Sequence, residues 1–160
     1  MLIHPFPPVY NENSRILILG SFPSVKSREQ LFFYGHPRNR FWKVISSVFS
    51  SEEPQTIQGK REFLLQHRIA LWDVLASCEI TGSADSSIRN AVPNDLGAIL
   101  EAAPIEKIFV NGKTAAYYYG KFQEEQCQRA AITLPSTSPA NAAWSLERLT
   151  DAWRTLLLET

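Results

Sequence analysis

The chain contains four short apolar segments in which hydrophobic residues follow one another almost without polar interruption. They cover residues 15–20, 69–75, 107–111 and 131–135. Such runs are typical of strands that are covered on both faces, as in a parallel sheet, whereas strands with one wet face alternate polar and apolar residues. The four segments therefore predict buried, parallel strands.

Helical patterns fill the stretches between these strands. Apolar residues recur at helical spacing over about 37–49, 58–67, 113–120 and 140–158, and in a segment after Asn94. Strands that alternate with helices form βαβ units. We therefore expect an α/β protein with three layers, α/β/α, around a central four-stranded, mostly parallel sheet. The length of 160 residues suits a single domain, 1–160.

The composition excludes several classes of protein. No apolar run is long enough to span a bilayer, and the N-terminal residues lack the charged start of a secretory signal, so we expect a cytoplasmic protein without a membrane partner. Cys78 and Cys127 lie far apart, and His4, His36 and His67 have no partner at metal-ligand spacing. We therefore expect no disulfide framework, no metal and no cofactor.

Charged residues suggest a nucleic-acid contact at one place in the sequence. The formal net charge is zero, which argues against a protein that coats nucleic acid without specificity. One basic cluster, opposed only by Glu29, consists of Lys26, Arg28, Arg38, Arg40 and Lys43. It is either an ordinary solvated face or a set of phosphate contacts.

Ligands of such α/β folds bind at the carboxyl ends of the strands. Two connections there, 20–36 and 78–94, are longer than usual and are expected to carry function. The first begins with GSFP, formed by Gly20, Ser21, Phe22 and Pro23. Phe22 can stack on a flat base, or it can fill the core below the turn.

The segment YGHPRNRFWKVI over 34–45 suggests a helix with Pro37 in its first turn. Asn39 would then lie beside the positive helix end, where its amide can donate one hydrogen bond and accept another. Such an amide suits a leaving base or a water molecule. The alternative is that Asn39 only ties the loop to the helix.

The segment LPSTSPAN over 134–141 follows the last expected strand. Ser138, followed by Pro139, is a candidate helix N-cap. The hydroxyl groups of Ser136, Thr137 and Ser138, together with free backbone amides, suit a phosphate group.

Three further features lie at the same edge. Asp73, near the end of the second strand, can accept a hydrogen bond from a base N–H, and Asn111 ends the third strand. The NGKT sequence after that strand lacks the first glycine of a P-loop, because Lys107 stands there, so we exclude nucleoside triphosphate binding. In GSADSSIR, phosphate contacts from Ser86, Ser87 and Arg89 compete with the alternative that Asp85 caps a short helix over 86–90.

GHPRNRFWKVI resembles the block that follows the first motif of bacterial mismatch-specific uracil/thymine DNA glycosylases. The whole set, GSFPS, HPRNRFW, LWDV, GSADSSIR and PSTSPAN, more closely resembles the hypoxanthine (deoxyinosine) branch of the uracil-DNA glycosylase superfamily. The similarity extends from Ile16 to Asn141. Phe22 and Leu134 stand where other branches carry polar catalytic residues, and the resemblance implies that Asn39 takes over their role.

The resemblance implies a monofunctional glycosylase that hydrolyses the N-glycosidic bond of a flipped-out deaminated base. Hypoxanthine is the base that we expect before any other. The alternatives are a uracil or G:U/G:T mismatch enzyme, a non-catalytic nucleotide- or DNA-binding module, and a small esterase that uses Ser21. The partner would be DNA with a deaminated base, and we expect a monomer without lyase activity. The expected base contacts are Gly20, Ser21, Phe22, Pro23, Asp73 and Asn111. The expected DNA contacts are Lys26, Arg38, Arg40, Arg89, Ser136, Thr137 and Ser138.

Overall fold

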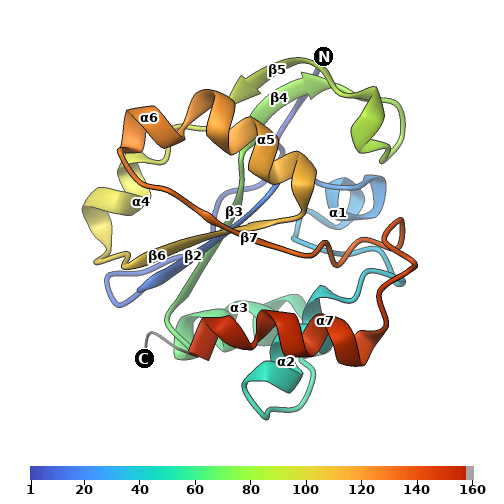
Figure 1. The fold of residues 1–160 in the computed structure, drawn as a ribbon, viewed down its shortest axis with the longest axis vertical. Helices are drawn as coiled ribbons and strands as arrows, with labels where there is room; N and C mark the ends of the chain where they lie inside the picture. Colours follow the sequence, from blue (N-terminus) through green and yellow to red (C-terminus); the bar gives the residue numbers. More distant parts are fainter. Residues whose placement is uncertain (158–160) are drawn as a thin grey trace.

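A computed structural model describes residues 1–157 and confirms the expected central sheet (Figure 1). Four strands pair in the order β3-β2-β6-β7, and every pairing is parallel. Their bounds are Ile16–Gly20 for β2, Ile69–Asp73 for β3, Lys107–Asn111 for β6 and Ile132–Leu134 for β7. Each coincides with an apolar segment of the sequence.

The continuous apolar runs reflect cover on both faces of this sheet. In β2, Ile16 and Ile18 belong to one core cluster, whereas Leu17 and Leu19 belong to the other. Figure 1 shows α2, α3 and α7 on one side of the sheet and α4, α5 and α6 on the other. Successive side chains of a strand point to opposite faces. In a strand between two layers both sets of side chains are therefore buried, and both are apolar.

The five helices expected from the sequence are all present with altered bounds, and residues 1–157 contain two further α-helices. The first two after β2 are α1, Val25–Gln30, and α2, Phe41–Val48, and they are followed by α3, Ile57–Gln66, and α4, Gly97–Ala102. The remaining helices are α5, Lys113–Phe122, α6, Glu124–Cys127, and α7, Leu146–Trp153. The short helices α1 and α6 were not expected from the sequence.

Two predicted helix starts are wrong. Helix α2 begins at Phe41, so Pro37 lies in a turn before the helix and not in its first turn. Helix α7 begins at Leu146, where Ser145 is the N-cap and accepts from the backbone N–H of Arg148. Ser138 therefore caps no helix, because its hydroxyl group accepts from the N–H of Ala140 within a turn.

The expected C-terminal helix over 140–158 is correspondingly shorter. A 3-10 helix, η2, Arg154–Leu157, continues α7, and Leu158 lies outside the described residues. Asp85 does not cap a helix over 86–90 either. It opens a 3-10 helix, η1, Asp85–Ser87, whose N-cap is Ala84, and the chain then extends into a strand.

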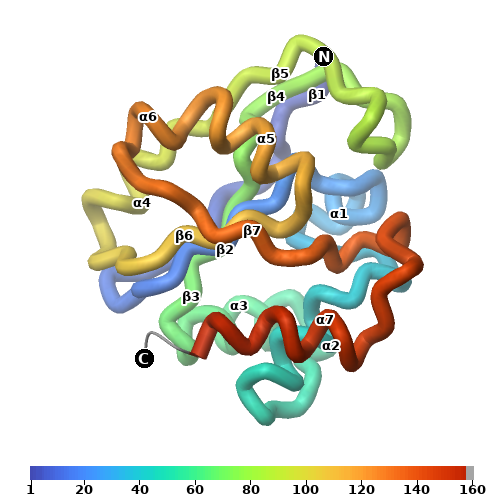
Figure 2. Tube along the Cα trace, viewed as in Figure 1, coloured from blue at the N-terminus to red at the C-terminus, as the bar shows by residue number. Residues whose placement is uncertain are grey.

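That strand belongs to a second, antiparallel sheet that the sequence did not reveal. It consists of β1, Leu2–Ile3, β4, Leu75–Glu79, and β5, Arg89–Pro93, in the order β1-β4-β5. Figure 2 shows β1 alongside β4 near the N-terminus. The chain passes from β3 into β4 across a single residue, Val74, so the second sheet starts beside the end of a central strand.

Candidate functional site

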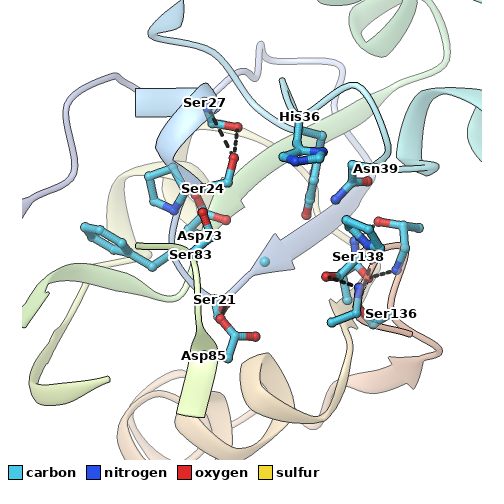
Figure 3. Close-up of a pocket in the computed structure, with 18 of the residues that line it drawn as sticks. Ser21, Ser24, Ser27, His36, Asn39, Asp73, Ser83, Asp85, Ser136 and Ser138 are labelled. Carbon is cyan, nitrogen blue, oxygen red and sulfur yellow. Dashed lines mark hydrogen bonds between the residues drawn. The ribbon is translucent and has the colours of Figure 1, made fainter. Parts of the chain in front are cut away.

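A pocket of about 510 Å³ opens at the carboxyl ends of the parallel strands (Figure 3). Gly20 ends β2, Asp73 ends β3 and Asn111 ends β6, while residues 136–138 follow β7. All of them line the pocket, together with Ser21, Phe22, Pro23 and Asn39. The structure therefore brings together Asn39, all six expected base contacts and the 136–138 segment.

Asn39 is held by the turn before α2. Its Oδ1 accepts from the N–H of Phe41 at 2.9 Å, and its own backbone N–H donates to the carbonyl of His36 at 3.0 Å. Within residues 1–157 no hydrogen bond of the Nδ2 group is recorded, and Figure 3 shows this nitrogen on the pocket side. Asn39 thus does tie the loop to the helix, and it also leaves an amide donor free to face a ligand.

Phe22 combines the two interpretations left open by the sequence. Its side chain is buried in the core cluster that contains Leu17 and Leu19, yet it also lines the pocket. The Arg28 guanidinium carbon lies 5.8 Å from the centre of the Phe22 ring. A cation above one ring face stabilises the ring position and leaves the other for packing or for a ligand.

Asn111 and Thr137 bond to each other rather than to the pocket. The Asn111 Nδ2 group donates to Thr137 Oγ1 at 3.0 Å, and Asn111 Oδ1 accepts from the Thr137 N–H at 3.1 Å. Thr137 is completely buried. These two residues therefore join β6 to the loop after β7, and the Thr137 hydroxyl group is not placed to reach a phosphate.

Arg40 clamps the same loop from the other side. Its backbone N–H donates to the Thr137 carbonyl, and its guanidinium group donates to the carbonyls of Asn141, at 3.0 Å, and Trp144. Asn141 in turn donates from Nδ2 to the carbonyl of Ser136 at 2.9 Å. The HPRNRFW and PSTSPAN segments are thus a connected unit, and Arg40 is engaged within it.

The other expected DNA contacts lie outside the pocket lining. Lys26 is exposed and pairs with Glu29 at 3.5 Å, a surface ion pair of little energetic weight. Arg38 is exposed in the turn before α2, and Arg89 is exposed on β5. These three cations can meet a DNA backbone only around the pocket, not within it.

Sequence reasoning missed His4 as a site residue. Its Nε2 lies 2.8 Å from Oδ2 of Asp73, and both side chains are almost fully buried. The second carboxylate oxygen of Asp73 lies over Gly20, because a Cβ on that glycine would fall 2.5 Å from Oδ1 and 2.8 Å from the Tyr34 hydroxyl oxygen. Glycine is therefore required at this point by the close approach of two polar groups.

Tyr34 is the second residue that the sequence did not single out. Its hydroxyl group is buried, lacks a hydrogen-bond partner among residues 1–157, and belongs to a residue that lines the pocket. Burial, together with the nearby Asp73 carboxylate, raises the pKa of Tyr34 well above its ordinary value, against an opposing interaction with the Asn111 side chain. The phenol is thus a neutral donor at any physiological pH, and an unpaired buried donor is a contact available to a ligand.

Asp85 supplies another carboxylate to the pocket. Its Oδ1 accepts from the Ser21 hydroxyl group at 3.2 Å, and Figure 3 shows the two side chains together at one side of the cavity. Although the residue as a whole is exposed, loss of water around the carboxyl group raises the pKa of Asp85, against opposing hydrogen bonds from Ser21 and Thr114. Sequence reasoning noticed this residue only as a helix cap.

The described residues contain neither a candidate metal site nor a candidate membrane span. Within residues 1–157 no three His, Cys, Asp or Glu side chains come together in a way that could hold a metal ion. Across the same part of the chain, no helix has the length and apolar character to cross a bilayer. The pocket is lined by amide, carboxylate and hydroxyl groups together with aromatic rings.

Comparisons with known proteins find similar sequences and a similar fold. Residues 7–157 match the sequence profile of the Uracil DNA glycosylase superfamily. A protein named hypoxanthine DNA glycosylase from Methanosarcina acetivorans is 34% identical over 150 residues, which cover 92% of this chain and 94% of that protein. A second protein of that name, from Methanosarcina barkeri, is 37% identical over 116 residues, covering 71% and 73%.

A solved structure shares the fold. It is a solution NMR structure of a Methanosarcina acetivorans protein described as a candidate uracil DNA glycosylase. The TM-score is 0.80 at 32% identity, and the match covers 98% of this chain and 99% of the other.

Proposed function

Because the chain belongs to the uracil DNA glycosylase superfamily, we propose that it is a monofunctional DNA glycosylase that releases hypoxanthine from deoxyinosine in DNA. Hydrolysis of the N-glycosidic bond yields the free base and an abasic site. The two relatives named hypoxanthine DNA glycosylase support this choice of base. The observation that carries the proposal is that Asn39 and Phe22 line one pocket, which is large enough to admit a base.

The target nucleotide must leave the double helix before its glycosidic bond can be reached. In the proposal, the base enters the pocket and packs against Phe22, while Asp73 Oδ1 accepts from the base N1–H. A damaged pair opens at lower cost than a normal one, which favours damaged bases before any contact is made.

Bond cleavage builds positive charge on the sugar and negative charge on the departing base. A preorganised donor directed at the growing negative charge lowers the barrier, because it needs no reorganisation during the reaction. The free Nδ2 group of Asn39 is such a donor, fixed by the bond between its Oδ1 and the Phe41 N–H. Asp85 is our candidate for orienting the attacking water, because its carboxylate faces the same pocket.

The loop after β7 is the proposed contact with DNA phosphate. Ser136 and Ser138 line the pocket mouth, whereas the buried Thr137 holds the loop in place. Lys26, Arg38 and Arg89 would act around this mouth as general phosphate contacts. Arg40 would act indirectly, through the loop carbonyls that it binds.

No lysine lines the pocket among the described residues. A lyase reaction needs an amine that attacks the sugar carbon, so the proposal includes hydrolysis without strand cleavage. We also propose that the protein acts as a monomer in the cytoplasm. Borohydride treatment during turnover should trap no covalent protein–DNA adduct, and a trapped adduct would contradict the monofunctional assignment.

Single-turnover assays test the function directly. The protein is incubated with oligonucleotides that carry hypoxanthine, uracil or only normal bases, and alkali then cleaves the strand at abasic sites. We expect cleavage of the hypoxanthine strand at a rate above that of the uracil strand, and none of the normal strand. Faster release of uracil would replace hypoxanthine as the substrate, and inactivity on both strands would refute the assignment.

A further inference from the structure

The N-terminal segment places a buried side chain, that of His4, against Asp73, which lines the pocket. His4 follows β1, and its backbone N–H donates to the carbonyl of Ala76 at 2.8 Å, which continues the antiparallel pairing with β4. Its Nε2 lies 2.8 Å from Asp73 Oδ2, although the two residues are 69 positions apart in the chain. Only 4% and 5% of the two side-chain surfaces remain exposed.

Aromatic rings fix the orientation of the imidazole. The His4 ring lies 4.6 Å from the ring of Phe6, 6.0 Å from that of Phe22 and 6.4 Å from that of Trp72, each contact being edge-to-face. The Phe33 ring lies 6.2 Å away. Because these rings enclose the imidazole, it cannot turn without displacing several buried groups.

The same burial selects the tautomer of His4. Its Nδ1 is buried and has no hydrogen-bond partner among residues 1–157. A buried N–H without a partner costs more than a bare ring nitrogen, so the ring proton belongs on Nε2, where Asp73 accepts it. His4 is thus a donor, and Oδ2 of Asp73 is occupied as an acceptor.

The remainder of Asp73 is equally constrained. Its carbonyl accepts from the Asn94 side chain at 2.9 Å, and Asn94 in turn accepts, through its carbonyl, from the buried amide of Gln123 at 2.8 Å. The Oδ1 atom lies above Gly20, and both residues line the pocket. This oxygen takes no part in the His4 bond, which uses Oδ2. One acceptor atom is therefore held in place from both the backbone and the side chain.

We propose that His4 is a positioning residue that aims Asp73 Oδ1 into the pocket as an acceptor and thereby selects bases with a ring N–H at their pairing edge. The inference rests on the proposed glycosylase function. Hypoxanthine carries a hydrogen on N1, and uracil carries one on N3. Adenine instead presents a lone pair at N1, so it would face the carboxylate as a second acceptor.

This selection matters because adenine is the normal base from which hypoxanthine arises by deamination. The two purines have nearly the same shape, so a pocket cannot separate them by size. A site built around one hydrogen bond can reject an analogue that lacks the group by about 10,000-fold or more, because a buried polar group is left unpaired. A carboxylate free to rotate would lose this discrimination, because its oxygen would no longer be held against the pairing edge of the base.

The test first compares the wild-type protein with two His4 variants on matched hypoxanthine and adenine oligonucleotides under single-turnover conditions. His4→Leu removes the donor at similar volume, and His4→Gln keeps an N–H near the position of Nε2. We expect His4→Leu to lose at least about 10-fold in hypoxanthine release and to show a smaller hypoxanthine-to-adenine rate ratio, and His4→Gln to recover most of both. In an Asp73→Asn background, His4→Leu should have no further effect on the ratio.

A purely structural His4 would give a different pattern. His4→Leu would then lower the melting temperature and slow release of hypoxanthine with an unchanged base ratio, and its effect would persist in Asp73→Asn. That result overturns the inference while the proposed function stands. If the wild-type protein releases no hypoxanthine, the proposed function fails, and this inference fails with it.

A measurement on the wild-type protein does not depend on how the variants fold. Long-range ¹H–¹⁵N NMR correlations of the imidazole distinguish a proton on Nε2 from one on Nδ1. We expect the Nε2–H form with a hydrogen-bonded proton for His4, while His36 and His67 serve as references in the same spectrum. A His4 proton on Nδ1 would overturn the proposed bond to Asp73.

Discussion

The oxygen and the nitrogen of the Asn39 amide have different surroundings, so two substitutions can separate their roles. Oδ1 accepts from the Phe41 N–H, whereas Nδ2 faces the pocket. Asn39→Asp keeps an acceptor for Phe41 and replaces the donor with a second acceptor. Asn39→Ala removes both groups.

The magnitudes follow from these contacts. Loss of one preorganised donor to a developing negative charge costs about 100- to 1000-fold in rate, or about 2.7–4 kcal/mol of barrier. Both variants should therefore lose at least about 100-fold in single-turnover release of hypoxanthine. Asn39→Ala should also lose about 1 kcal/mol of unfolding free energy, because the Phe41 N–H loses its partner, whereas Asn39→Asp should not.

The assay measures abasic-site formation at saturating enzyme, together with urea denaturation of each protein. Asn13→Asp is the matched control, because Asn13 is exposed in a loop and does not line the pocket. It should keep wild-type activity. If Asn39→Asp releases hypoxanthine within about three-fold of the wild-type rate while Asn39→Ala is inactive, the essential atom is Oδ1 and the donor argument is refuted.

Three further predictions test other parts of the structure. A water-orienting Asp85 must be ionised, so activity should rise with pH through its raised pKa, and Asp85→Asn should be slow with this acid-side rise absent from its pH–rate profile; an unchanged profile would exclude the role. Thr137→Val leaves the half-buried Asn111 amide without its acceptor and should cost about 1 kcal/mol in urea denaturation, whereas a neutral effect would mean that the loop is held elsewhere. The hydrogen bond from Arg15, together with its charge, lowers the pKa of Glu106, so the stability lost in Glu106→Gln should be present at neutral pH and disappear as pH falls through that lowered pKa; a difference that persists in acid would contradict the pairing.

The parts of the fold that were predictable are those with a local signal. Strands β2, β3 and β6 are mostly apolar because both faces of the sheet are covered there, and this is visible in one segment at a time. The edge strand β7 is an exception to the expected burial, because Ile132 and Thr133 are exposed. The second sheet leaves no such signal. Its strand β5 is mostly exposed, and β1 has only two residues, so neither shows a period that could be read.

The same distinction applies to the site. Asn39 and the residues of GSFP were found because they follow a strand or precede a helix within a recognisable segment. The contact of His4 with Asp73 joins segments that are 69 positions apart. The sequence around His4 contains no pattern that predicts a buried polar partner. The turn before α2 was missed because the His36 ring accepts from the Arg38 N–H, a side-chain bond that competes with the helix at its expected start.

The polar residues of the site fall into two groups. Some use their hydrogen-bonding atoms within the protein, and others keep one such atom available to a ligand. Asn111 and Thr137 satisfy each other, and Arg40 is committed to loop carbonyls, so substitution of any of them removes a bond within the protein. Asn39 and Asp73 each use one oxygen, Oδ1 and Oδ2 respectively, for a hydrogen bond within the protein. Their second polar atoms, Nδ2 of Asn39 and Oδ1 of Asp73, lie at the pocket. A fixed group with one unused bonding position is what stabilisation of a transition state requires, because its orientation is set before the substrate arrives. The free atom of Asn39 is a donor and that of Asp73 is an acceptor, which matches a base that gains negative charge while it still carries a ring N–H.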